Sequence, residues 1–145
     1  MPIKFEVPGQ PVGKGRPRFV RKTGHAYTPK KTQVYEDGLR RAGEQAMRDD
    51  PLLTCPISLY VCAYFQVPKS WSKKKQQLAY DGVILPTGRP DGDNVLKAVG
   101  DALNGVVWRD DSQVVFGQIK KLYSLEPKTE VTVFAMREYI PATGV

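Results

Sequence analysis

The sequence predicts an α+β fold in which helices pack on one mixed or antiparallel sheet. Three observations support this class. Strand-like alternation of apolar and polar residues occurs near both ends of the chain and in its middle. Helical spacing of apolar residues occurs between these strands. The length of 145 residues suits one compact domain, and we expect residues 1–145 to form it.

The first half of the chain contains the clearest single strand. Residues 3–7 alternate and predict an opening strand, and residues 18–21 and 26–28 flank a glycine-bearing turn that predicts a short hairpin arm. A helix is expected over residues 30–48, followed by a strand over residues 57–67 whose strict alternation predicts a central place in the sheet. The predicted inward stripe of the helix consists of Val34, Leu39, Ala42, Ala46 and Met47.

The second half predicts two helices and then two strands. A serine precedes residues 73–80, which predicts a short capped helix, and apolar spacing predicts a second helix over residues 93–103. Residues 113–123 and 130–137 are expected to form strands, with residues 126–129 joining them as a hairpin.

Basic residues dominate the charge and occur in two clusters. The chain has 22 Lys and Arg against 15 Asp and Glu, a formal net charge of +7, which favours partners that carry phosphates. A solvated surface that keeps the protein soluble is the alternative interpretation of each cluster. The candidate phosphate contacts are Lys14, Arg16, Arg18, Arg21 and Lys22 in the first cluster, and Lys73 and Lys74 in the second.

Apolar runs are too short for a membrane protein. None approaches the ~20 residues that a membrane-spanning helix requires. The N-terminus does not have the long apolar segment and cleavage site of a secretory signal, so we expect a cytoplasmic protein.

Two carboxylates stand one residue apart where the second-half helix begins. In extended backbone Asp91 and Asp93 would point the same way and could share one hard cation through oxygen ligands. The alternative is a helix cap, because Asp is common at helix starts. Lys97 lies one helical turn after Asp93, near the carboxylates and a bound phosphate, or else in an ordinary ion pair. Asp101 lies one turn further and is interpreted as the partner that orients Lys97.

A third carboxylate is expected from Asp110 or Asp111. We expect the chain to return after the helix and bring this pair towards Asp91 and Asp93, although an Asp pair before Ser112 is also typical of a turn. Carboxylates brought together need a cation, and Mg2+ accepts a few of them while it keeps water ligands for a phosphate substrate.

At these residues the sequence resembles the RusA family of Holliday junction resolvases. The resemblance runs through residues 89–97, 101–105 and 108–114, and the segments 13–18 and 27–29 are similar to phage and prophage members. It implies a homodimeric, bacterial or phage-encoded crossover junction endodeoxyribonuclease that resolves four-way DNA junctions by paired symmetric nicks in DNA recombination and repair. It also implies Mg2+ as the cofactor, with Mn2+ as an alternative. The implied catalytic residues are Asp91, Asp93, Lys97 and Asp111, with Asp91, Asp93 and Asp111 as metal ligands and Asp110 as the other candidate for the third position.

Two alternatives belong to other classes of function. A metal nuclease with the same carboxylates could act on other branched DNA, such as flaps or forks. A basic DNA-binding protein without catalytic activity would use its acidic residues only to cap a helix and close a turn.

Overall fold

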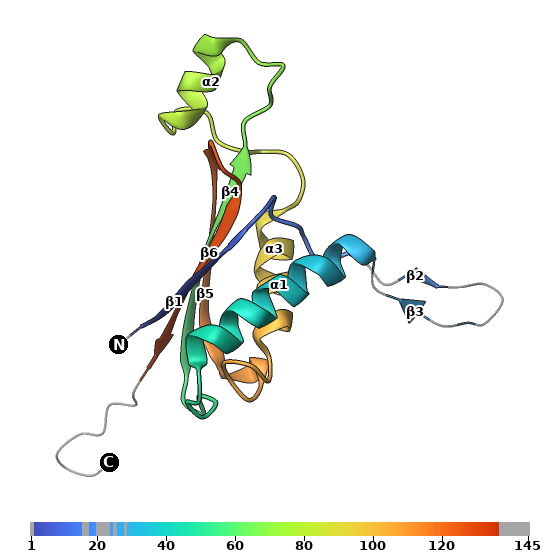
Figure 1. Cartoon of the computed structure of the whole chain (residues 1–145), viewed down its shortest axis with the longest axis vertical. Coiled ribbons are helices and arrows are strands. Elements are labelled where there is room, and N and C mark those ends of the chain that lie inside the picture. Colours follow the sequence, from blue (N-terminus) through green and yellow to red (C-terminus); the bar gives the residue numbers. More distant parts are fainter. Residues whose placement is uncertain (1, 16–17, 20–23, 25, 28, 137–145) are drawn as a thin grey trace.

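The computed structural model describes residues 2–15, 24 and 29–136, and the backbone of residues 18–19 and 26–27. The elements follow the predicted order (Figure 1). They are β1 (Ile3–Pro8), β2 (Arg18–Phe19), β3 (Ala26–Tyr27), α1 (Lys30–Met47), β4 (Ile57–Gln66), α2 (Lys73–Tyr80), α3 (Gly92–Leu103), the 3-10 turn η1 (Asp111–Gln113), β5 (Val114–Ser124) and β6 (Lys128–Ala135).

The main sheet has the strand order β1-β6-β4-β5. β6 pairs antiparallel with both β1 and β4, whereas β4 and β5 are parallel, so the sheet is mixed and the predicted α+β class is confirmed. β4 lies inside the sheet, as its alternation predicted. Its inward residues are almost fully buried because they point to the face of the sheet on which helices pack: they are Ile57, Leu59, Val61, Ala63 and Phe65.

The predicted hairpin between the last two strands is wrong. β5 and β6 do not pair with each other, because β4 lies between them: Gln66 pairs with Ser124 of β5, and Tyr64 pairs with Lys128 of β6. The short connection over residues 125–127 therefore crosses the end of β4. Pairing on both edges satisfies the backbone of the most apolar strand, which a local hairpin would leave with one free edge.

The helices α1 and α3 lie on the same face of the sheet (Figure 1). Leu39 of α1, Leu103 of α3 and Trp108 are fully buried between them and the sheet. Leu39 and Met47 confirm part of the predicted α1 stripe, but Val34 is 59% exposed. The buried face is rotated away from Val34 because its other members are Thr32, Tyr35, Glu36 and Gly43.

Two elements project from this core. The arm β2–β3 extends from the start of α1, with Arg18 paired to Tyr27, and α2 lies beyond the end of β4 (Figure 1). Ser72 caps α2 as predicted, its hydroxyl accepting a hydrogen bond from the Lys75 backbone. Within the described residues, no helix combines the length and apolar character needed to cross a membrane.

Candidate active site

Asp91 and Asp93 occupy the first positions of α3. Asp91 is the N-cap residue with extended backbone (φ −63°, ψ 146°), and its carbonyl accepts hydrogen bonds from the amides of Asn94 and Val95. Its carboxylate makes no capping hydrogen bond, and both Asp side chains belong to exposed residues. The structure therefore gives Asp91 the cap position without the cap interaction, and its carboxylate faces solvent.

Gly92 explains how this acidic pair is held against the sheet. A Cβ atom at Gly92 would stand 3.2 Å from Cγ2 of Ile119, so the first turn of α3 packs directly on β5. Lys121, two residues further along β5, donates a hydrogen bond from Nζ to the Gly88 carbonyl at 2.7 Å. These contacts hold the residues on both sides of Asp91 against β5.

Lys97 is exposed one turn after Asp93 and, among the described residues, forms no ion pair. Asp101, the expected partner of Lys97, instead lies 3.1 Å from Nζ of Lys14. This differs from the prediction because the segment after β1 passes between α1 and α3 and carries Lys14 to that side of the helix. The Lys97 ammonium is thereby left facing solvent on the same helix as the acidic pair.

Lys14 has a structural role that its sequence context did not indicate. Its Nζ lies 2.7 Å from Glu36 of α1 and 3.1 Å from Asp101 of α3, so it links the two helices. Partial burial lowers the pKa of Lys14, but hydrogen bonds to Glu36 and Asp101 and their charges outweigh it, so the pKa is raised. Two carboxylates therefore match the charge of Lys14 in this structure, and its role as a phosphate contact stays a prediction.

Asp110 and Asp111 have different surroundings. The Asp110 carboxylate accepts hydrogen bonds from the amide and hydroxyl of Ser112, and Gln113 accepts one from the Asp110 amide at 2.8 Å. The hydrogen bonds from Ser112 lower the pKa of Asp110, and together with Gln113 they make Asp110 the cap of η1. Asp111 is half-buried, and its carboxylate accepts a hydrogen bond from the indole Nε1 of buried Trp108 at 2.9 Å.

Hydrogen bonds tie the residues on either side of Asp111 to the segment before β4. The Leu53 amide donates a hydrogen bond to the carbonyl of Val107, the residue before Trp108. Gln113 Nε2 donates hydrogen bonds to the carbonyls of Leu53 (2.8 Å) and Cys55 (3.1 Å). No role was predicted for either Trp108 or Gln113 from the sequence. A buried Trp three residues before a carboxylate is a signal that could have indicated one, because a buried indole N–H needs an acceptor.

The third carboxylate does not join the first two within one chain. Trp108, whose indole donates a hydrogen bond to Asp111, forms a β-bridge with Asn104 at the C-terminal end of α3. Asp91 and Asp93 lie at the N-terminal end of the same helix. A helix of 12 residues is ~18 Å long. Accordingly, no group of three or more His, Cys, Asp or Glu side chains in the described part of the chain is placed to hold a metal ion. The expected return is not observed, because the chain leaves α3 directly for the start of β5.

The predicted basic contacts are distributed over different parts of the fold. Lys73 and Lys74 are exposed in the first turn of α2, where neighbouring Lys75 stacks 4.0 Å from the ring centre of Trp71. Arg18 lies on β2, but its side chain is outside the described part. The other three predicted contacts lie outside the described residues: Arg16, Arg21 and Lys22.

Comparisons with known proteins assign the chain to a family of nucleases. The family model described as Endodeoxyribonuclease RusA matches residues 8–134, which include the acidic motif and most of the fold. The chain belongs to this family. It is also similar to the uncharacterised protein YqaN of Bacillus subtilis (strain 168), with 42% identity over 135 residues that cover 90% of this chain and 94% of YqaN.

Proposed function

We propose that this protein is a Mg2+-dependent endonuclease that acts as a homodimer on four-way DNA junctions. The observation that carries this proposal is the uncapped, exposed pair Asp91 and Asp93, with Lys97 one turn away, in a chain of the RusA endodeoxyribonuclease family. Carboxylates kept out of local hydrogen bonds are available as ligands for a hard cation, and Mg2+ prefers oxygen ligands of this kind. A role limited to capping would not need a free Asp91 carboxylate.

A second copy of the chain is needed to complete the set of carboxylates. In one chain Asp111 lies at the far end of α3, so Asp91 and Asp93 alone remain at the first turn. A two-fold axis beside β5 would place the partner's Asp111 at that turn. The same symmetry gives two equivalent sites, which suits paired cuts in a junction with two-fold symmetry.

The free edge of β5 is the place we propose for this pairing. β5 is the last strand of the sheet, so one of its edges has no neighbouring strand in the described part of the chain, and Val115 (61% exposed) and Phe116 (47% exposed) lie along it. Exposed apolar edge strands are ready to pair with another chain. Antiparallel pairing of two β5 strands about an axis near Gly117 would set position 111 of one copy beside position 123 of the other. Lys121, near that position, anchors the loop that leads to Asp91.

The proposed roles follow from these surroundings. Asp91, Asp93 and Asp111 would be the ligands, and Asp111 is favoured over Asp110 because Asp110 is engaged by Ser112. The buried Trp108 indole would orient Asp111, as hydrogen bonds to metal-binding carboxylates commonly do. Lys97 would bind a non-bridging oxygen of the phosphate and stabilise the charge that develops there during phosphodiester hydrolysis.

The deciding experiment compares a labelled four-way junction with a linear duplex of the same arms, in Mg2+ or in EDTA. We expect paired nicks on the junction that need Mg2+ and are lost in Asp93→Asn. The thermal midpoint should rise with Mg2+ in the native protein, because a ligand that binds the folded state stabilises it, and should rise less in Asp93→Asn. Equal cutting of flaps or forks would support a broader branched-DNA nuclease. Binding without nicks and without thermal stabilisation would contradict the proposal and support a binding protein.

A further inference from the structure

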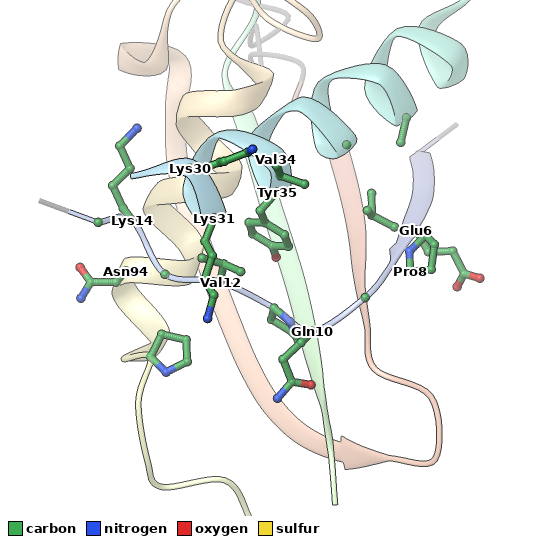
Figure 2. A pocket seen from close by; sticks show the side chains of 18 of the residues that line it. Glu6, Pro8, Gln10, Val12, Lys14, Lys30, Lys31, Val34, Tyr35 and Asn94 are labelled. Carbon is green, nitrogen blue, oxygen red and sulfur yellow. The ribbon is translucent and has the colours of Figure 1, made fainter. Parts of the chain in front are cut away.

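A groove of about 1850 Å3 runs between α1 and the segment after β1, and it ends at the start of α3 (Figure 2). Its walls come from α1, from residues 6–15 and from residues 89–94, which include Asp91. Pockets for small molecules are typically ~300–1,000 Å3. The groove is therefore better suited to an extended polymer than to a small ligand.

The charged side chains of this groove that have no ion-pair partner among the described residues are mostly positive. Lys30, Lys31, Arg41 and Arg89 line it, are exposed, and form no ion pair among the described residues. The groove lining also includes Glu6, whose carboxylate lies 3.4 Å from Nζ of Lys128 and is thus partly neutralised. Asp91 is the remaining acidic group of the lining, and it stands at one end.

These cations are arranged along one face of α1. Lys31, Val34, Gly38 and Arg41 are three or four residues apart, a spacing that places them on the same side of the helix. Figure 2 shows Lys31 and Val34 on the groove side of α1, opposite the segment that carries Val12. The exposure of Val34, which is 59%, is explained by this position, because it lies in the wall of an open groove.

We infer that this groove binds the sugar–phosphate backbone of one DNA arm and leads that strand to Asp91. The inference rests on the proposed function and deepens it. Lysine and arginine side chains supply contacts to phosphates without regard to sequence, and apolar Val34 offers a surface for deoxyribose. Asp91, at the end of the row of cations, then meets a strand whose position is already fixed.

The length of the groove agrees with this occupant. The ten residue-to-residue steps from Lys31 to Arg41 rise by ~15 Å along α1. One strand of B-form DNA advances ~3.4 Å per nucleotide along the duplex axis, so the row spans roughly four nucleotides. Two phosphates of one strand can therefore meet Lys31 and Arg41 at the same time.

The test is the salt dependence of junction binding by Lys31→Ala/Arg41→Ala, measured with a fluorescent junction in Ca2+ or EDTA. Loss of two phosphate contacts should make binding several-fold weaker and reduce the slope of log K against log salt by about two. The matched control is Lys4→Ala/Arg40→Ala, which removes the same charge. Arg40 adjoins Arg41 but lies outside the groove lining, with its guanidinium 2.9 Å from Asp37.

A slope that falls for the groove variant and stays within a few tenths for the control would support the inference. Equal falls in the two variants would overturn it, because net charge alone would then explain the loss. An unchanged slope in the groove variant would also overturn it. Nicking by the native protein is measured with the same junction in Mg2+. If the native protein nicks the junction but the groove variant binds DNA as the native protein does, the groove inference fails while the proposed function stands. A native protein that does not nick, with a groove variant that binds more weakly than the control, would reject the nuclease and keep the groove.

Discussion

Two inactive variants should restore each other's activity if the active site is shared between two chains. When Asp91→Asn and Asp111→Asn chains are co-expressed, a mixed dimer contains one site with both substitutions and one site with neither. Random pairing makes about half of the dimers mixed, so about a quarter of all sites are intact. The initial rate of nicking should therefore return to about a quarter of the native rate. The product should be a junction nicked in one strand, because each mixed dimer has one intact site.

The control for this experiment is a mixture of Asp91→Asn and Asp93→Asn chains. These residues stand in the same turn of α3, so every site of a mixed dimer still has one substitution. We expect no recovery in this mixture. The assay is a denaturing gel of a junction labelled on one strand at a time, with the proportion of mixed dimers measured by two affinity tags. If Asp91→Asn with Asp111→Asn stays as inactive as the single variants while mixed dimers are present, the sharing of sites across two chains is refuted.

Two further predictions concern single residues near the site. Asp110→Asn should keep most of the nicking rate, because Asn is an equally good cap for η1. Asp111→Asn should reduce the nicking rate at least a hundredfold. A reduction of similar size in both variants would contradict the assignment of Asp111 as the ligand. Lys14→Met should reduce the free energy of unfolding by roughly 1–3 kcal/mol at neutral pH, since it leaves Glu36 without its cation. The pKa of Lys14 is raised above 10.5 in the folded state. Its contribution should therefore be constant from neutral pH up to that value and decline above it, and urea unfolding of both proteins across this range measures the difference.

The elements could be predicted from the sequence because their signals are local. The alternation of β4 gave both its extent and its central position, and the serine before α2 acted as its cap. The partners of β5 and β6 could not be predicted in the same way. A turn between two strands favours a hairpin only when no more apolar strand competes for the same edges, and β4 competes for both.

The chemistry of the candidate site stays a prediction, and its geometry within one chain differs from the expected one. Side-chain type and helical spacing singled out Asp91, Asp93 and Lys97 as candidates, and the structure places all three at or after the start of α3. The position of Asp111 depends on where the chain goes after the helix, which spacing does not determine. The role of Lys14 was missed for a related reason: its two partners, Glu36 and Asp101, are 22 and 87 residues away in the sequence.

The segment between β1 and the arm connects the proposed DNA groove to the acidic pair. Its Lys14 amide donates a hydrogen bond to the Asn94 carbonyl at 2.9 Å, while the Lys14 side chain holds Glu36 of α1 and Asp101 of α3. A side chain at Gly13 would stand 2.7 Å from Cβ of Pro90, so the segment packs closely against the residue before Asp91. The groove face of α1 and the first turn of α3 are thus linked by one stretch of backbone. Because of this link, a phosphate held on α1 has a fixed position relative to Asp91, which a nuclease requires of its scissile strand.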